Sequence, residues 1–363
     1  MANTLNLSQD NLVFDQEFNS ANSLSLRSSS NPNGVFDTTY NNNLHTLPSN
    51  GEKEYYVSAD QFGSLGVDPF SVNNGHLTIA ANPTSSGAMS QTGGLPYTSG
   101  LLTTEHSFAQ TYGIFQMTAE LPAGQGMWPA FWLLPTDHSW PPEIDVMEVL
   151  GNNMTQLYTS THSTATNPSG ITKANTVTDM SNGYHTYAVD WEPNTITYYF
   201  DGQQVYQTAT PADMHKPMYM LANLAVGGYW PGDPNSSTHF PADMNITSIK
   251  AYATANTIAS VNTTTLPSTA PVATDHTPTT TTPAPTPSSS TSTSTPTPTP
   301  TPAPNSTTVA AHTPTPTPMP SDSASAHDGG FGAIIHSEVF HVTDLTQLVS
   351  ELHHLAALFG HWA

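Results

Sequence analysis

Short runs of alternating polar and apolar residues, separated by Gly, Pro and Asn, fill the chain from about Leu12 to Thr254. The clearest runs are residues 113–120, 184–191, 195–200 and 203–207. Because successive side chains of a strand point to opposite faces of a sheet, this alternation indicates half-buried strands. The pair Asp201-Gly202 joins the last two runs and favours a tight hairpin turn. No helical pattern of similar length interrupts the runs, so we predict an all-β sandwich of two antiparallel sheets.

A different composition begins after residue 261. Residues 262–326 are mostly Thr, Ser, Pro and Ala, and 15 of the 32 prolines lie between Pro267 and Pro320. Proline donates no backbone hydrogen bond, so this segment is predicted to be an extended, disordered linker. We therefore expect a β-sandwich domain over residues 1–261, with its core at 12–254, then the linker over 262–326, then a C-terminal segment over 327–363.

The C-terminal segment carries apolar residues at helical spacing, which predicts an amphipathic helix over 344–359. Asp344 is suited to cap its start and Gly360 to end it. The spaced residues are Leu345, Leu348, Leu352, Leu355 and Phe359.

The start of the chain lacks the usual N-terminal signal peptide, because residues 1–20 are polar and contain no Lys or Arg. No segment is apolar enough to span a membrane. The linker and the few basic residues nevertheless suggest a secreted or cell-surface protein. Export would use either an uncleaved signal within 327–363 or a leader carried by a precursor.

The 363-residue chain has 5 Lys and Arg against 27 Asp and Glu, a net charge of −22. Nucleic acids and anionic membranes are bound through clustered basic residues, so neither is expected as a partner. Without cysteine, the chain can form no disulfide, no Cys-ligated zinc site and no cysteine nucleophile. We expect a monomer that needs no cofactor.

Residues 140–149, Trp-Pro-Pro-Glu-Ile-Asp-Val-Met-Glu-Val, are the most informative segment. In a regular strand Glu143 and Asp145 share one face, whereas Glu148 falls on the opposite, apolar face. A β-bulge near residues 146–147 would return Glu148 to the acidic face. Like charges held close raise at least one carboxyl pKa, so that a neutral acid and a carboxylate coexist near neutral pH. Glycoside hydrolysis needs such a pair, one carboxyl at the anomeric carbon and another protonating the leaving oxygen.

Two other interpretations of these carboxylates stay open, an acidic solvated face and a calcium site. The apolar neighbours Ile144, Val146 and Val149 fit a central strand better than an exposed edge. Calcium loops usually set carboxylates among Gly and Asn in a flexible turn, which this segment is not. Catalysis is the favoured interpretation, and no residues are assigned to a metal, although a structural calcium ion elsewhere stays open.

Aromatic residues precede the carboxylates, with Trp128 and Trp132 in the run 124–135 and Trp140 close behind. Aromatic rings stack on the C–H faces of sugars, so these residues are candidates for glycan binding. The alternative is that Trp128 and Trp132, which share a strand face, belong to the core.

Further blocks extend this pattern along the chain: 13–19, 75–81, 97–104, 112–113, 128–132, 143–148, 161–162, 190–192, 201–202, 223–232 and 240–244. In content and order these blocks resemble glycoside hydrolase family 16, the laminarinase and lichenase group of concanavalin-like β-jelly-roll enzymes. The bulged carboxylate signature and the block 223–232 resemble its β-1,3-glucanase branch in particular. The resemblance covers about residues 12–254.

The resemblance implies a role for each carboxylate in a retaining mechanism. Glu143 would be the nucleophile, Glu148 the general acid/base, and Asp145 the residue that orients and tunes Glu143. His162 would lie near the acid/base. The other residues implied to bind substrate are Trp128, Trp132, Trp140, Asn223 and Trp230.

One block departs from the family pattern. Where many members have Phe-Glu-x-Arg, this chain has Phe115-Gln116-Met117-Thr118. In the family those side chains help to bind sugars on the non-reducing side of the cleft, so Gln116 is a candidate for that position. The substitution leaves the chemistry intact and the exact glucan open.

These observations predict a retaining endo-glycosidase that hydrolyses internal β-1,3 or mixed β-1,3/1,4-glucan linkages, with a polysaccharide as its partner. A non-catalytic glycan-binding sandwich would use the aromatics without the carboxylates, and the complete carboxylate set disfavours it. A family 16 enzyme for another polysaccharide, such as a galactan or a bacterial exopolysaccharide, is the other alternative.

Overall fold

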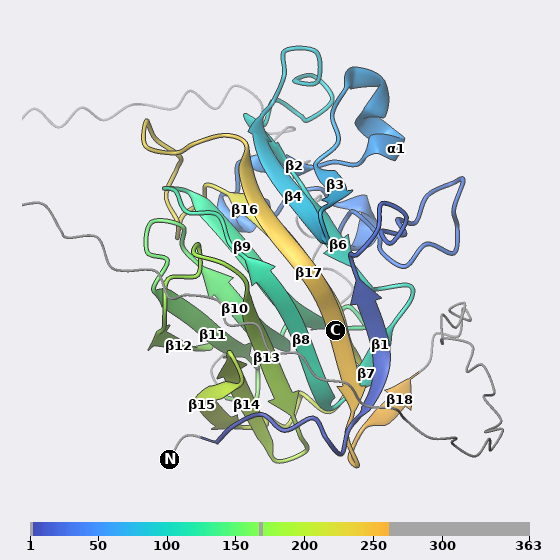
Figure 1. Cartoon of the computed structure of the whole chain (residues 1–363), viewed down its shortest axis with the longest axis vertical. Helices are drawn as coiled ribbons and strands as arrows, with labels where there is room; N and C mark the ends of the chain where they lie inside the picture. The colour runs from blue at the N-terminus through green and yellow to red at the C-terminus, as the bar shows by residue number, and fades with distance from the viewer. Residues whose placement is uncertain (1–2, 167–169, 261–363) are drawn as a thin grey trace, which may run out of the picture. The chain divides into compact units, whose positions relative to one another are not determined.

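The computed structural model describes residues 3–166 and 170–260. Its strands form one 10-stranded and one 8-stranded sheet, whose pairings are antiparallel except for one short parallel pair between β2 and β5. The predicted all-β sandwich is confirmed (Figure 1). The predicted linker over 262–326 and helix over 344–359 lie outside the described residues.

The 10-stranded sheet follows the order β15-β14-β13-β8-β17-β4-β5-β2, with β1 paired to β17 and β3 to β4. Its strands are β1 (Asn11–Glu17), β2 (Glu54–Tyr56), β3 (Phe70–Asn73), β4 (His76–Pro83), β5 (Tyr97–Ser99), β8 (Gly113–Glu120), β13 (His185–Trp191), β14 (Thr195–Phe200), β15 (Gln203–Ala209) and β17 (Ala242–Ala253). The runs predicted from alternation are β8, β13, β14 and β15. Asp201 and Gly202 both have positive φ, 49° and 72°, as a primed hairpin turn requires.

The 8-stranded sheet follows the order β12-β11-β10-β9-β16-β7-β18, with β6 paired to β16. Its strands are β6 (Leu101–Thr103), β7 (Ala109–Thr111), β9 (Met127–Pro135), β10 (Glu143–Val149), β11 (Gln156–His162), β12 (Ile171–Thr176), β16 (Met218–Val226) and β18 (Ile258–Ser260). The segment that carries the three carboxylates, β10, is therefore a central strand with neighbours on both sides.

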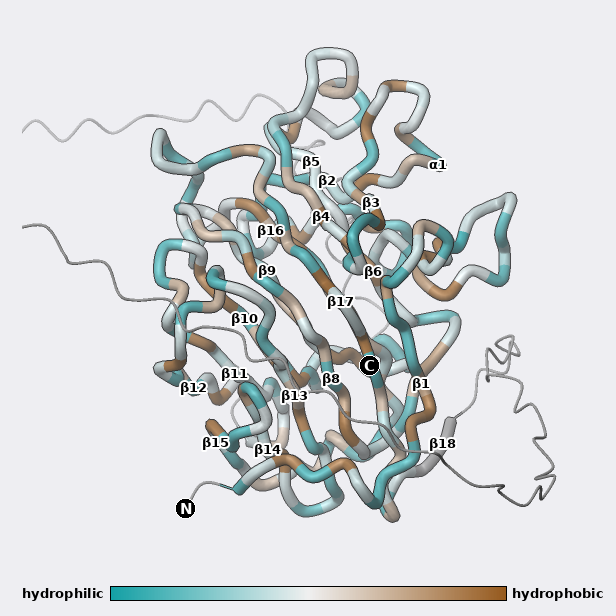
Figure 2. Tube along the Cα trace, in the orientation of Figure 1, coloured by the Kyte–Doolittle hydropathy of each residue, from teal (hydrophilic) through white to brown (hydrophobic). Residues whose placement is uncertain are grey.

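One hydrophobic core fills the space between the two sheets. It takes Phe115 and Met117 from β8, Val189 and Trp191 from β13, and Ile144 from β10. Along strands such as β17 the tube in Figure 2 alternates between hydrophobic and hydrophilic residues. Each sheet thus turns one face to this core, and the other face of the 8-stranded sheet carries a second, smaller hydrophobic cluster that includes Trp132, Tyr219 and Leu221.

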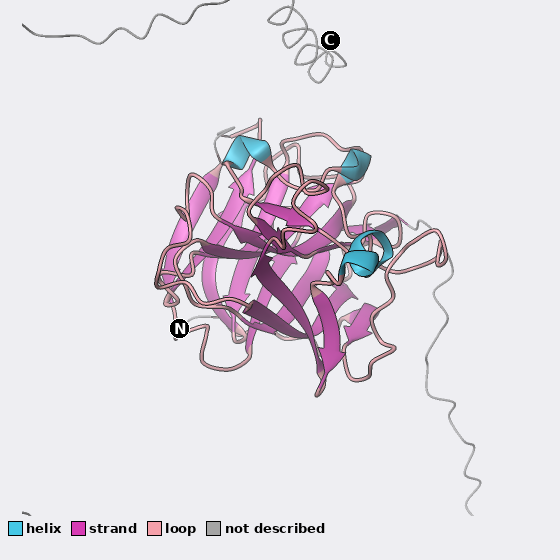
Figure 3. Cartoon of the chain, turned by 90° about the horizontal axis from the view of Figure 1, so that it is seen from above, coloured by secondary structure: helices cyan, strands magenta, loops and turns pink. Residues whose placement is uncertain are grey.

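The described helical segments are short and lie in loops outside the two sheets (Figure 3). They are α1 (Ala59–Phe62) and the 3-10 turns η1 (Asn41–Asn43), η2 (Pro48–Asn50) and η3 (Gly63–Leu65). None of the helices in the described part of the chain has the length and hydropathy needed to cross a bilayer.

Candidate active site

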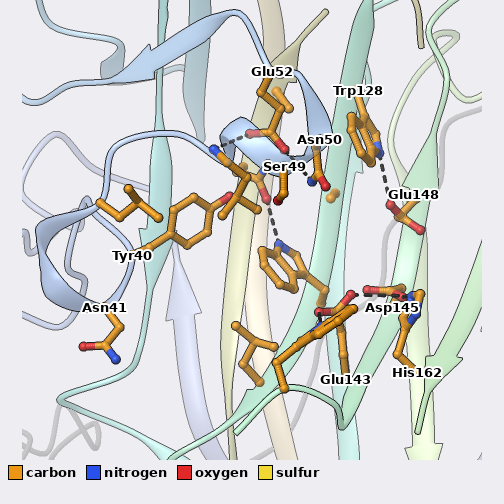
Figure 4. A pocket seen from close by; sticks show the side chains of 18 of the residues that line it. Tyr40, Asn41, Ser49, Asn50, Glu52, Trp128, Glu143, Asp145, Glu148 and His162 are labelled. Carbon is orange, nitrogen blue, oxygen red and sulfur yellow. Dashed lines mark hydrogen bonds and ion pairs between the residues drawn. The ribbon is translucent and has the colours of Figure 1, made fainter. Parts of the chain in front are cut away.

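A bulge in β10 gathers the three carboxylates on one face. Against β9, Asp145 is paired with Trp132 and Met147 with Phe131, so β10 advances two residues where β9 advances one. The extra residue turns Glu148 back to the face of Glu143 and Asp145. All three side chains line a single cleft (Figure 4).

Glu143 lies between an indole, an imidazole and a second carboxyl. The Trp140 Nε1–H donates a hydrogen bond to Glu143 Oε2 at 2.8 Å, and His162 Nε2 is 3.7 Å from Glu143 Oε1. Burial raises the pKa of Glu143 well above its ordinary value, and the neighbouring Asp145 adds to the shift. Both the indole and a protonated His162 favour the ionised form of Glu143 and so oppose this shift.

Asp145 is the most deeply buried member of the cluster, only 2% exposed, and its Oδ2 is 3.1 Å from His162 Nε2. Burial raises the pKa of Asp145 well above its ordinary value, and the nearby Glu148 raises it further. A hydrogen bond joins the carboxyls of Asp145 and Glu143. Since such a bond needs a proton, the two groups are not both ionised.

Glu148 occupies the other end of the cluster. Burial, and next the charge of Glu143, raise the pKa of Glu148 to about 8. The Trp128 Nε1–H donates to Glu148 Oε1 at 3.1 Å, which favours the carboxylate and limits the rise. At neutral pH Glu148 is therefore mostly a protonated acid beside the Glu143–Asp145 pair, the arrangement that general acid catalysis requires.

Glu143, Asp145 and His162 also bring potential metal ligands together. One donor atom from each lies within 4.8 Å of the other two. Two carboxylates and an imidazole are donors that a divalent cation accepts. The hydrogen bond between the two carboxyls and their close approach to His162 account for this grouping on their own, and we assign no metal to it.

The cleft is a cavity of about 780 Å³. Trp128, Trp132, Trp140 and Trp230 line it together with the carboxylates, so the predicted tryptophans come together around the predicted acids. Trp140 is 61% exposed and Trp230 41% exposed, whereas Trp132 is only 9% exposed. The two exposed indoles are available to a bound sugar, while Trp132 belongs to the cleft floor.

A chain of hydrogen bonds connects residues in the floor and wall of the cleft. Trp132 Nε1–H donates to Asn223 Oδ1 at 2.8 Å, and Asn223 Nδ2 donates to the Tyr56 hydroxyl at 2.9 Å. Tyr56 in turn is hydrogen-bonded to Tyr40. Asn223 lines the cleft as predicted, but it is only 4% exposed and its contacts hold Trp132 and the wall in place.

Two predicted positions differ in the structure. Gln116 is placed on β8 of the 10-stranded sheet, paired with Ala188 and Lys250, and it does not line the cleft. The prediction that Gln116 lies at a sugar subsite is wrong, because its strand neighbours Phe115 and Met117 point to the core and Gln116 points outward.

His162, expected beside Glu148, instead contacts Glu143 and Asp145, because β11 pairs Glu143 with His162.

Sequence reasoning missed an acidic pair in the opposite wall. Glu52 is 7% exposed and Glu54 is fully buried, and a hydrogen bond joins their carboxyls. Glu52 accepts hydrogen bonds from the Leu47 N–H at 3.2 Å and from Asn50 Nδ2 at 2.9 Å (Figure 4). Burial raises the pKa of both carboxyls. The available signal was the spacing Glu52-Lys-Glu54, which in a strand sets both carboxyls on one face.

Comparison with known proteins places this site in context. Residues 58–248 match the sequence profile described as "Glycosyl hydrolases family 16". Two curated relatives from Rhizobium meliloti (strain 1021) are endo-1,3-1,4-beta-glycanase ExsH, 45% identical over 256 residues, and endo-1,3-1,4-beta-glycanase EglC, 43% identical over 255 residues. Each alignment covers 69% of this chain and 54% of the relative, so the chain spans about half the length of these relatives.

A solved structure gives the same comparison in three dimensions. The laminarinase catalytic domain from Thermotoga maritima MSB8 aligns with a TM-score of 0.57 and 29% identity, over 69% of this chain and 100% of that domain. The described sandwich thus corresponds to the whole of that catalytic domain.

Proposed function

The chain belongs to glycosyl hydrolase family 16, and from this membership we propose that it is a retaining endo-glycosidase acting on internal β-1,3 or mixed β-1,3/1,4 linkages of a glucan. The observation that carries the proposal is the position of Glu143, Asp145 and Glu148 on one face of β10, within an open cleft and with raised pKa values. A sugar-binding protein without catalysis would have no reason to bury three carboxyls together.

In the proposed first step, the Glu143 carboxylate attacks the anomeric carbon while Glu148 gives its proton to the glycosidic oxygen. The C–O bond to the leaving chain breaks and a covalent glycosyl ester forms on Glu143. In the second step, Glu148, now ionised, takes a proton from water, and the water oxygen displaces Glu143. Two inversions give net retention and return both groups to their starting states.

Asp145 and His162 position the nucleophile in this mechanism. In the free site the hydrogen bond between the two carboxyls raises the pKa of Glu143 and lowers that of Asp145. For the attacking state we assign the shared proton to Asp145, because Glu143 must then be ionised and the Trp140 N–H at 2.8 Å stabilises its carboxylate. Asp145 then donates a hydrogen bond to Glu143 and holds its carboxylate in line for attack. Glu148 keeps its proton because burial and the charge of Glu143 raise its pKa to about 8.

A neutral polysaccharide suits the cleft best. Its lining includes the four carboxyls of Glu52, Glu143, Asp145 and Glu148, and no Lys or Arg among the described residues that line it. A sulfated or uronate backbone would find no Lys or Arg there to pair with its own charges. The names of the two relatives, both endo-1,3-1,4-beta-glycanases, agree with β-1,3 and β-1,4 linkages in the substrate.

We further propose that the protein acts as a monomer outside the cell. One chain supplies every wall of the cleft, and polymeric glucans are found mainly outside cells. Light scattering on the purified protein, together with activity in the culture medium, tests both points.

The experiment that tests the function has two parts. Purified protein is first incubated with laminarin, lichenan, agarose and carrageenan, and new reducing ends are measured. We expect cleavage of laminarin or lichenan, and cleavage of agarose or carrageenan alone would contradict the proposal. Glu143→Ala and Glu148→Ala are then given azide and an aryl β-gluco-oligosaccharide.

The azide products separate the two roles. Azide replaces the missing nucleophile in Glu143→Ala and gives an α-glycosyl azide by one inversion. In Glu148→Ala the glycosyl ester still forms, and azide attacks it to give a β-glycosyl azide. The same anomer from both variants, or the reverse assignment, would overturn the roles of Glu143 and Glu148.

A further inference from the structure

A tyrosine beyond the cleft is exposed in a way that the catalytic roles do not explain. We propose that Tyr229 is a stacking platform for one sugar ring, an outer subsite that extends the cleft along a bound glucan chain. The inference rests on the proposed function, because the occupant is a further ring of the same substrate. Tyr229 is 85% exposed, more than any other large hydrophobic side chain in the described part of the molecule.

The ring of Tyr229 has one covered face. A Cβ atom built on Gly51 would lie 3.0 Å from Cε1, 3.0 Å from Cζ and 3.1 Å from Cε2 of the ring. Nearly equal distances to three ring carbons mean that Gly51 approaches the flat face and not the edge. Since the backbone of Gly51 covers one face and the side chain is 85% exposed, the opposite face is open.

The loop that carries Tyr229 is held firmly against the loop that carries Gly51. The Tyr229 N–H donates to the Asn50 carbonyl at 2.8 Å, and the Lys53 N–H donates to the Val226 carbonyl at 2.8 Å. A Cβ on Gly228 would lie 2.9 Å from the Asn50 carbonyl oxygen, so the two backbones are in close contact. The backbone that carries the ring is therefore held in place before any ligand arrives, which lowers the entropy cost of stacking.

The platform adjoins residues that line the cleft. The next residue, Trp230, lines the cleft and packs edge-on against Trp128 with ring centroids 5.4 Å apart. Trp128 in turn donates its hydrogen bond to Glu148. Asn50, whose carbonyl anchors Tyr229, also lines the cleft. A glucan chain leaving the cleft on the Glu148 side thus passes from Trp230 to Tyr229.

The chemistry of the platform selects a pyranose ring. An aromatic face attracts the C–H face of a sugar, and it needs no charge on the ligand. Because the contact is far from the reacting bond, it contributes equally to binding of the substrate and of the transition state. Its loss should therefore raise KM and leave kcat unchanged.

The test compares substrates of increasing length. Wild type, Tyr229→Ala and Tyr229→Phe are assayed on β-1,3-gluco-oligosaccharides, from the shortest that is cleaved up to the polymer. For the long substrates we expect Tyr229→Ala to raise KM about five- to tenfold, the worth of one aromatic stack. Its KM for the shortest substrate and its kcat should match wild type. Tyr229→Phe should behave as wild type, because stacking does not need the hydroxyl.

Tyr184→Ala is the matched control, since Tyr184 is 42% exposed and packs against His76 away from the cleft lining. Tyr184→Ala should change neither KM nor kcat. Binding without turnover is measured by titrating long and short oligosaccharides into Glu143→Gln and into the double variant Glu143→Gln/Tyr229→Ala. An unchanged KM ratio between long and short substrates in Tyr229→Ala would overturn the platform alone. Failure of wild type to cleave any glucan would overturn the proposed function and the platform with it.

Discussion

The cleft face of the 8-stranded sheet and the outer face of the 10-stranded sheet both carry polar side chains, yet they treat charge in opposite ways. On the cleft face Asp145 is 2% exposed and has only an imidazole as basic neighbour. On the outer face Glu17 and Asp15 have half-exposed side chains, and Lys250 Nζ lies 2.8 Å and 3.4 Å from their carboxylates. The acid on the cleft face is buried and has no Lys or Arg beside it, whereas the acids on the outer face are solvated and paired with a lysine.

This difference supports the cleft face as the place of the proposed chemistry. Burial and like charge raise the carboxyl pKa values on the cleft face, so that proton donor and nucleophile coexist there. Such groups are held at a cost in folding free energy, which the hydrophobic core between the sheets must offset. Substitutions on the cleft face should therefore alter function strongly, and matched ones on the outer face should alter little.

The largest expected effect comes from Glu143→Gln. Removing the proposed nucleophile while keeping its shape should lower kcat about 10³-fold or more, measured as reducing ends released from the best polymer. Gln116→Glu, which puts a carboxyl on the outer face of β8, should change kcat less than about twofold. Near-wild-type turnover by Glu143→Gln would end the distinction between the two faces.

Trp132→Phe should have the next largest effect, this time on stability. It removes the N–H that Asn223 Oδ1 accepts at 2.8 Å and leaves a buried acceptor unpaired. We expect the free energy of unfolding in urea to fall by about 1–3 kcal/mol. Thr118→Val on the outer face breaks only the 3.3 Å contact with the Thr186 hydroxyl and should change it by less than about 0.5 kcal/mol.

A double-variant cycle separates the hydrogen bond from the lost ring volume. Once Asn223→Leu has removed the acceptor, Trp132→Phe should cost less than it does alone. Fully additive losses would mean that the Trp132–Asn223 bond contributes nothing and that packing explains the whole effect.

A smaller effect is expected on the pH profile. Loss of the Glu148 proton should give kcat/KM an alkaline limb near pH 8 in wild type, since the acid must be protonated to act. The Trp128 N–H lowers the pKa of Glu148 by stabilising its carboxylate, so Trp128→Phe should raise that pKa. The limb should move upward by about one pH unit or less. Trp230→Phe, which removes no donor to Glu148, should leave the midpoint in place, and a downward shift in Trp128→Phe would contradict the assigned hydrogen bond.

Much of the fold could be predicted from local pattern. Alternation placed β8, β13 and β14 nearly to their ends, and Asp201-Gly202 marked the hairpin between β14 and β15. The bulge in β10 followed from one requirement, that Glu148 share a face with Glu143. These features depend on neighbours in sequence, which is why the sequence alone was sufficient.

The misplaced residues depend instead on contacts between distant segments. Alternation says that Gln116 lies on the face opposite Phe115, but not which of the two sheets carries its strand. His162 lies beside Glu143 because of the β10–β11 register, which no local pattern encodes. Glu52 and Glu54 were missed because carboxylates are usually exposed, and only the folded wall shows that both are buried. The division of the chain at 261 and 326 stays a prediction.

The smallest expected effect is that of Lys250→Met on the outer face. Lys250 joins β17 to Asp15 and Glu17 of β1, and its side chain is 19% exposed. Exposed carboxylates lose little when their cation is removed, because water solvates them. The free energy of unfolding should therefore fall by less than about 1 kcal/mol. Added salt should shrink even this difference, since it screens the pair in wild type. Glucan hydrolysis should stay unchanged. A loss comparable to that of Trp132→Phe, insensitive to salt, would mean that the outer face depends on buried charge just as the cleft does.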